Sequence, residues 1–244
     1  MSWFHDWFNS PYYAKLYQNR NEQEARSFVD TLVKELRLPK GSRFLDIACG
    51  KGRHSIHLYE KGYKVLGIDI AENNIEEASK HTEDNLKFLV YDMRQPLPVP
   101  QLAIYDAAVN LFTSFGYFED DNDNDRTFDA ASAALKPGGF MVVDFLNAQK
   151  VIKNLVKEEI KSVNGTFFFI HREYDGKHIT KTISFDDKGE QHEYRERVQA
   201  LHLADFEKLF NDNGMQLIKK FGDYRLRAFD PEQSDRLVMI AQKL

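Results

Sequence analysis

One stretch of this 244-residue chain decides its fold: Phe44-Leu45-Asp46-Ile47-Ala48-Cys49-Gly50-Lys51-Gly52-Arg53-His54-Ser55. Its first five residues are an apolar run that predicts a short buried strand. Two glycines separated by one residue follow, and the pattern then becomes that of a helix. A strand that turns tightly on glycines into a helix brings backbone N–H groups and a helix N-terminus close to a ligand. The stretch therefore predicts a ligand-binding turn.

A second apolar run, Lys64-Val65-Leu66-Gly67-Ile68, predicts the next strand, and it ends in the acid Asp69. Asp69 lies about 20 residues past the glycines, the spacing at which a carboxylate can meet ribose hydroxyls in a βαβ unit. The two strands together predict a pocket for a cofactor that contains adenosine.

Strands and helices alternate through the first part of the chain. The predicted strands lie near 43–48, 64–69, 86–90, 105–110 and 140–145, and helices are predicted near 52–61, 71–80 and 121–135. Regular alternation of this kind predicts an α/β fold with a parallel, doubly wound sheet and right-handed crossovers.

The pattern changes after about residue 158. Three segments, 166–174, 178–186 and 192–201, are separated by the turns Asp175-Gly176 and Asp187-Lys188-Gly189 and predict an antiparallel β-meander. A helix over 203–213 and strands over 215–221 and 237–243 follow. The meander is therefore predicted to be an insertion before the last helix.

Bulk composition narrows the class of protein. The net charge is −5 at pH 7, with 42% hydrophobic and 29% charged residues. This balance predicts a globular protein, and the negative charge argues against nucleic acid as a partner. The single cysteine, Cys49, excludes an internal disulfide and favours a cytoplasmic location. No run is long and apolar enough to span a membrane, and the aromatic start is not a signal peptide.

Taken in order, these pieces resemble the class I S-adenosylmethionine-dependent methyltransferases over residues 25–150 and 200–244. The resemblance is carried by the turn from Asp46 to Gly52, the strand-end acids Asp69 and Asp92, Asn110 after the fourth strand, and Leu135-Lys136-Pro137-Gly138-Gly139 before the fifth. Ala48 departs from the pattern, since the family often has its first glycine there.

The resemblance implies S-adenosylmethionine as the cofactor and S-adenosylhomocysteine as the product. It also implies a mostly parallel seven-stranded sheet with helices on both faces and an antiparallel last strand. The glycine-rich turn would back the methionine part, Asp69 would bind the ribose, Asp92 and Met93 would bind adenine, and Asn110 would border the sulfonium. The predicted cofactor-binding residues are Asp46, Ala48, Cys49, Gly50, Arg53, Asp69, Ile70, Asp92, Met93, Asn110, Leu111, Tyr17 and Arg20.

The same resemblance divides the chain into three parts. Residues 1–37 would form an N-terminal helical lid, 38–158 and 201–244 the cofactor-binding domain, and 159–200 an inserted β subdomain that covers substrate or contacts a second subunit. Tyr17 and Arg20 lie one helical turn apart and could reach the same carboxylate. The alternative is that the predicted helix that begins after Ser10 packs its aromatic face, with Tyr12, Tyr13 and Tyr17, on the core.

Two other kinds of ligand site would need residues that these motifs lack. A dehydrogenase would need a third glycine after Gly50 and Gly52, and the sequence lacks it. His54 and His57 share a helix face but have no further ligands, so no metal is predicted. The remaining alternative is that residues 45–55 form an ordinary βα turn in a protein that binds no nucleotide.

We expect methyl transfer by in-line displacement to an N, O or C nucleophile of a small molecule, without an assigned catalytic residue. The fourth strand lacks the Asn/Asp-Pro-Pro-aromatic motif found in methyltransferases that act on exocyclic or amide nitrogens. The aromatics Phe112, Phe115, Tyr117 and Phe118 favour an apolar or cation-tolerant acceptor. A non-catalytic S-adenosylmethionine-binding or assembly protein and an RNA methyltransferase stay open as alternatives, as do a monomer and a homodimer.

Overall fold

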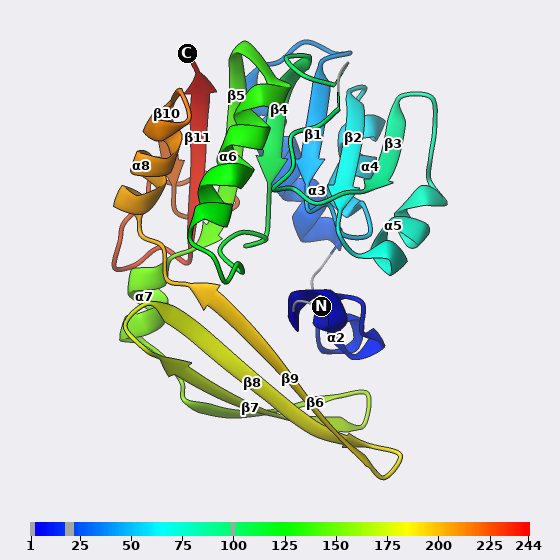
Figure 1. Cartoon of the computed structure of the whole chain (residues 1–244), viewed down its shortest axis with the longest axis vertical. Coiled ribbons are helices and arrows are strands. Elements are labelled where there is room, and N and C mark those ends of the chain that lie inside the picture. The colour runs from blue at the N-terminus through cyan, green and yellow to red at the C-terminus, as the bar shows by residue number, and fades with distance from the viewer. Residues whose placement is uncertain (1–2, 18–21, 99–100) are drawn as a thin grey trace.

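The computed structural model describes residues 3–17, 22–98 and 101–244. A seven-stranded sheet forms its centre (Figure 1). In sheet order, its strands are β10 (Met215–Phe221), β11 (Arg236–Lys243), β5 (Leu135–Leu146), β4 (Tyr105–Asn110), β1 (Arg43–Ile47), β2 (Lys64–Asp69) and β3 (Leu86–Val90). Strands β1 to β5 pair in parallel, whereas β11 runs antiparallel to both β5 and β10. The predicted doubly wound, mostly parallel seven-stranded sheet is confirmed.

Helices cover both faces of this sheet because its central strands are apolar on both sides. Phe44 of β1 faces a cluster with helices α3 (Glu22–Leu36), α4 (Arg53–Glu60) and α5 (Glu72–Ser79). The next residue, Leu45, faces the opposite cluster with α6 (Asn122–Ala134) and α8 (Leu203–Asp212). Because successive side chains of a strand point to opposite faces, such continuous burial is typical of a sheet with two covered faces.

The inserted segment forms a second sheet of four antiparallel strands. They are β6 (Glu158–Val163), β7 (Thr166–Tyr174), β8 (His178–Asp187) and β9 (Glu190–Gln199), and they follow the short helix α7 (Ala148–Lys153). The predicted three-strand meander is wrong by one strand, β6. Only Val163 of β6 is buried, so its sequence lacks the alternation of apolar and polar residues that reveals a half-buried strand.

Two short helices near the N-terminus, α1 (Trp3–Phe8) and α2 (Pro11–Leu16), pack against the inserted sheet. Trp7 and Leu16 form an apolar cluster with side chains of β7 and β8, among them Phe168 and Phe185. Figure 1 shows both helices between the inserted sheet and the carboxyl ends of the parallel strands. The aromatic face of α2 therefore packs on the inserted sheet, and α1 is a helix that the sequence did not predict.

The Pro137-Gly138-Gly139 turn lies inside strand β5 rather than before it. The pairing register with β4 jumps from Leu135 to Phe140, and Gly138 adopts a φ of 76°. The turn is thus an irregularity within the strand, and a glycine allows its left-handed backbone.

Among the described residues, no helix has both the length and the apolar character needed to cross a membrane.

Candidate cofactor and substrate site

A cavity of about 600 Å³ lies between the carboxyl ends of the parallel strands and the N-terminal helices, and residues of both line it. Strands β1 and β4 are neighbours there, and the order of the chain reverses between them. Open α/β sheets bind ligands at such a switch point. Ten of the predicted cofactor-binding residues line the cavity: Tyr17, Ala48, Cys49, Gly50, Arg53, Asp69, Ile70, Asp92, Met93 and Leu111.

The glycine-rich turn after β1 has left-handed backbone at three alternate positions. Ala48, Gly50 and Gly52 have φ values of 58°, 56° and 80°. A Cβ on Gly52 would lie 2.8 Å from the ring of Phe88, so that position admits no side chain. Ala48 adopts the left-handed conformation without being glycine, at a cost on the order of 1 kcal/mol or more. The departure from the family pattern is thus accommodated as backbone strain.

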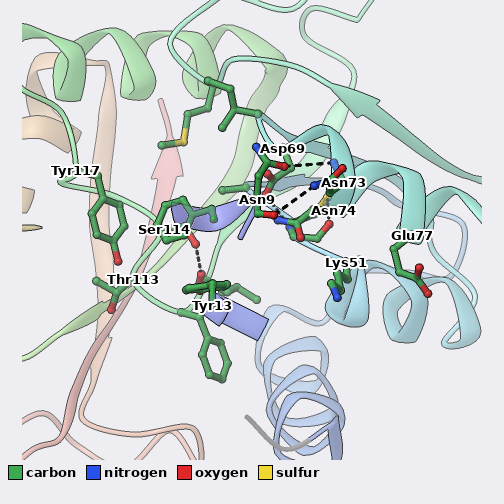
Figure 2. A pocket seen from close by; sticks show the side chains of 18 of the residues that line it. Asn9, Tyr13, Lys51, Asp69, Asn73, Asn74, Glu77, Thr113, Ser114 and Tyr117 are labelled. Carbon is green, nitrogen blue, oxygen red and sulfur yellow. Dashed lines mark hydrogen bonds between the residues drawn. The ribbon is translucent and has the colours of Figure 1, made fainter. Parts of the chain in front are cut away.

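Asp69, the last residue of β2, joins two backbone segments at the cavity. Its carboxylate accepts the N–H of Gly50 and the N–H of Ala71, each at 2.8 Å. Burial raises the pKa of Asp69, and these hydrogen bonds limit the rise. A buried carboxylate that lines the cavity at this point can accept hydrogen bonds from ligand hydroxyl groups. Figure 2 shows Asp69 beside Asn9 and Asn73 on one side of the pocket.

Asp92 has a cationic partner that the sequence analysis missed. Arg94 donates to both carboxylate oxygens of Asp92, with a shortest distance of 2.6 Å. Its other terminal nitrogen lies 2.6 Å from Asp123. Burial opposes ionisation of Asp92, but the hydrogen bonds from Arg94 outweigh it and hold the pKa below its usual value. Arg94 therefore links the predicted adenine end of the cavity to the first turn of α6.

Two of the predicted residues lie behind the cavity wall. Asp46 is buried and accepts the hydroxyl of Ser55 at 2.6 Å, and burial raises its pKa to about 7. Asn110 is buried and donates its amide to the carbonyl of Ile47 at 3.1 Å. These contacts fix β1 against α4 and β4. A third predicted residue, Arg20, lies outside the described residues.

Tyr17 lines the cavity, but its hydroxyl turns to the inserted sheet. It donates to the two carboxylate oxygens of Glu196 at 2.7 and 2.8 Å. The shared carboxylate suggested for Tyr17 and Arg20 stays a prediction, and in this structure the partner of Tyr17 is a side chain of β9.

The loop after β4 is strained and aromatic. Phe112 and Thr113 have φ values of 64° and 57°, which non-glycine residues rarely adopt. The guanidinium of Arg53 lies 4.0 Å from the centre of the Phe112 ring, and His54 lies on the same ring at 5.3 Å. Burial lowers the pKa of His54 to about 3, so this imidazole is neutral. The strain had no signal in the sequence, since neither residue is a glycine or an asparagine.

The part of the cavity nearest the N-terminal helices is aromatic. The rings of Phe8 and Tyr13 lie 5.1 Å apart, and those of Phe8 and Tyr117 lie 5.5 Å apart. Asn9 connects this wall to α5 by hydrogen bonds of 3.3 Å with Asn73. In Figure 2, Tyr117, Thr113 and Ser114 appear on the opposite side of the pocket from Lys51 and Glu77.

No group of three or more potential metal ligands occurs among the residues the structure describes. His57 instead lies 2.9 Å from Asp30 and 3.0 Å from Glu60, in contacts between α3 and α4. Burial raises the pKa of the Cys49 thiol, so this residue lines the cavity as a protonated side chain.

The strand order, the glycine-rich turn and the acid that ends β2 define a Rossmann-like protein with its ligand cavity at the topological switch point. The chain belongs to the methyltransferase-domain family, whose model matches residues 38–214, and with it to the class I S-adenosylmethionine-dependent methyltransferases. S-adenosylmethionine is therefore the cofactor that the fold is built to hold.

Curated relatives cover most of the chain. A putative methyltransferase of Bacillus subtilis, YqeM, is 28% identical over 225 residues, which span 86% of this chain and 87% of the relative. A glycine/sarcosine N-methyltransferase of Parasynechococcus marenigrum is 26% identical over 241 residues, which span 92% of this chain and 78% of the relative.

Solved structures share the fold at low identity. An S-adenosylmethionine-dependent methyltransferase of Clostridium acetobutylicum matches with a TM-score of 0.79 and 19% identity over 95% of this chain and 96% of its own. The structure of CalS10 from Micromonospora echinaspora, with S-adenosylmethionine bound, matches with a TM-score of 0.66 and 17% identity over 93% of both chains.

Proposed function

We propose that this protein transfers a methyl group from S-adenosylmethionine to an N, O or C nucleophile of a small molecule and releases S-adenosylhomocysteine. The observation that carries the proposal is one cavity with two different walls. The wall at the strand ends has backbone N–H groups and carboxylates, and the wall at the N-terminal helices is aromatic.

The first wall fits the predicted cofactor. The turn from Ala48 to Gly50 would back the methionine part, and the Arg53 guanidinium offers a positive charge for its carboxylate. Asp69 would accept the ribose hydroxyls, and Asp92 with the backbone of Met93 would meet adenine. When bound, S-adenosylmethionine supplies a methyl carbon that its sulfonium makes electrophilic.

The protein's own contribution is then positioning and exclusion of water. Leu111, Phe112 and the N-terminal helices surround the space between the two walls, where an acceptor would be held in line with the sulfur–methyl bond. Alignment of this kind can lower a barrier by several kcal/mol, on the order of 7 or more in favourable cases. No proton-transfer group is required for an acceptor that is already a neutral amine.

Amines are the first acceptors to test. Aromatic faces attract cations, so the rings of Phe8, Tyr13 and Tyr117 suit a product that carries a methylated ammonium. The similarity to glycine/sarcosine N-methyltransferases supports the same class. The net charge of −5 argues against an RNA substrate.

The proposal assigns a role to each segment of the chain. Helices α1 and α2 act as the lid, whereas α3 packs on the main sheet. Residues 38–158 with 201–244 bind the cofactor, and 159–200 support the lid. We propose a cytoplasmic monomer or homodimer that needs neither a metal nor a membrane for this reaction.

The test is incubation of the protein with a cell extract and deuteromethyl-labelled S-adenosylmethionine, followed by mass spectrometry. A new labelled small molecule supports the proposal. Calorimetric binding of the cofactor with no labelled product would instead favour the non-catalytic binding protein. Label in RNA, together with a salt-sensitive shift of RNA on mixing, would favour the RNA methyltransferase.

A further inference from the structure

The loop that follows β4 needs external support for its shape. Phe112 and Thr113 are consecutive, both are left-handed, and both line the cavity. Non-glycine residues keep such a conformation only where their surroundings over-determine it. The question is therefore which groups hold this backbone and what that conformation serves.

Asp144, near the end of β5, accepts hydrogen bonds from the backbone of this loop. Its carboxylate oxygen Oδ2 accepts the N–H of Phe112 at 2.8 Å, and its backbone carbonyl accepts the N–H of Thr113 at 3.0 Å. The Asp144 side chain is completely buried. One residue thus satisfies both amides of the strained pair.

Arg236, the first residue of β11, completes the support. Its Nε donates to Oδ1 of Asp144 at 2.8 Å, and its Nη2 donates to the hydroxyl of Thr113 at 2.8 Å. A guanidinium is a rigid planar fork, so these two bonds fix Thr113 relative to Asp144. Tyr224 adds a hydrogen bond to Oδ2 of Asp144 at 3.1 Å and stacks on the ring of Phe112.

The supporting groups do not line the cavity, whereas the loop they hold does. Asp144 and Arg236 therefore act on any ligand only through Phe112 and Thr113. A buried ion pair is weak evidence of added stability, because desolvation offsets much of its attraction. Its most direct structural effect here is a single conformation of the loop.

We propose that Asp144 and Arg236 are a positioning pair that sets the loop at Phe112–Thr113 for methyl transfer. The inference rests on the proposed function. The pair governs the turnover rate rather than cofactor affinity, because the cofactor contacts come mainly from the turn after β1 and the ends of β2 and β3.

The first test compares Arg236→Lys with Arg227→Lys. Lysine keeps a positive charge beside Asp144 but cannot also bond Thr113, whereas the ion pair of Arg227 with Asp223 lies on the surface. With the small molecule that takes up the deuteromethyl label in the extract as acceptor, we expect kcat to fall on the order of 10- to 100-fold in Arg236→Lys. The dissociation constant for S-adenosylmethionine should stay within a factor of about two, and Arg227→Lys should match the wild type.

A second variant keeps the ion pair intact, so it folds even if Arg236→Lys does not. Thr113→Val removes only the oxygen that accepts from Arg236, and Thr113→Ser restores it. We expect Thr113→Val to lower kcat and Thr113→Ser to recover most of the loss. A direct contact of Thr113 with the acceptor would make the effects of Thr113→Val and Arg236→Lys additive, whereas positioning makes them non-additive.

Hydrogen exchange supplies a readout that does not need activity. Both loop amides are bonded to Asp144, so a peptide covering residues 110–117 should exchange faster in both variants while the rest of β4 and β5 is unchanged. Three results would each overturn the inference. They are unchanged exchange together with unchanged kcat, equal losses of kcat and cofactor affinity, and additive effects of Thr113→Val and Arg236→Lys in the double variant. A wild type that exchanges as expected but never turns over would overturn the proposed function and leave the loop support standing.

Discussion

The carboxylate of Asp69 accepts the backbone N–H of Gly50 at 2.8 Å and so ties the end of β2 to the turn after β1. The two residues belong to different strands but line the same cavity. One acid therefore holds the turn in place and also lines the cavity with its carboxylate.

This double role predicts a large effect of Asp69→Ala on cofactor binding. Loss of a charged acceptor at a buried site typically costs about 1.5–3 kcal/mol. We expect the affinity for S-adenosylmethionine, measured by calorimetry, to fall at least tenfold. Asp69→Asn, which keeps one acceptor oxygen, should lose less. The exposed Asp84→Asn is the matched control, and equal affinity in all three variants would refute the assigned role.

The strain at Ala48 predicts a stabilising substitution. Its φ of 58° suits glycine, so Ala48→Gly should raise the free energy of unfolding by about 1 kcal/mol in a denaturant titration. Gly50→Ala is the reverse experiment. A Cβ on Gly50 meets nothing within 4 Å, so only the φ of 56° makes alanine unfavourable there. It should lower stability by a similar amount, and a neutral result in both variants would remove strain as the explanation.

Buried Asp46 predicts a pH dependence of stability. Burial raises its folded-state pKa to about 7 from the ordinary 3.8, so its contribution to stability is highest in acid and declines as pH rises through that window. Asp46→Asn removes the charge and keeps an acceptor for Ser55. We expect the melting temperature of the variant, relative to wild type, to increase between about pH 4 and pH 7 and to level off above pH 7. A difference that does not vary with pH would contradict the pKa shift.

The contacts of Glu196 predict that this residue anchors the N-terminal helices to β9. Its carboxylate accepts from Trp7 at 2.7 Å and from Tyr17 at 2.7 Å, and Lys181 lies 3.4 Å away. In Glu196→Ala, residues 3–17 should exchange their amide hydrogens faster, and the cofactor should dissociate faster. Glu193→Ala, on an exposed position of the same strand, should change neither rate. Equal protection in both variants would show that Glu196 does not anchor these helices.

Much of the main sheet could be predicted because its signals are local. The apolar runs at β1 and β2, each followed by a glycine-rich turn or an acid, mark strand ends in a parallel sheet, and the carboxyl ends of such strands meet at one edge. The convergence of Ala48, Asp69 and Asp92 on one cavity follows from that geometry. Strand β6 could not be found in this way because only its last residue, Val163, is buried.

The missed features depend on contacts between distant segments. The left-handed pair Phe112–Thr113 is held by Arg236, more than 120 positions along the chain, and neither loop residue is one that favours positive φ. Helix α1 is stabilised by packing on the inserted sheet, and local propensity does not reveal that long-range contact. Tertiary contacts of this kind outweigh the local preferences from which strands and helices are predicted.

The contact between Trp7 and Glu196 joins residues 189 positions apart. During synthesis, the five parallel strands emerge before β9 exists, and closing so long a loop carries a large entropic cost. The N-terminal helices therefore cannot dock until β9 has been made, and only α8, β10 and β11 follow it in the chain. Until β9 forms, the cavity wall that Phe8 and Tyr13 supply has no sheet to pack on, so the cavity is completed by the inserted segment as well as by the main sheet.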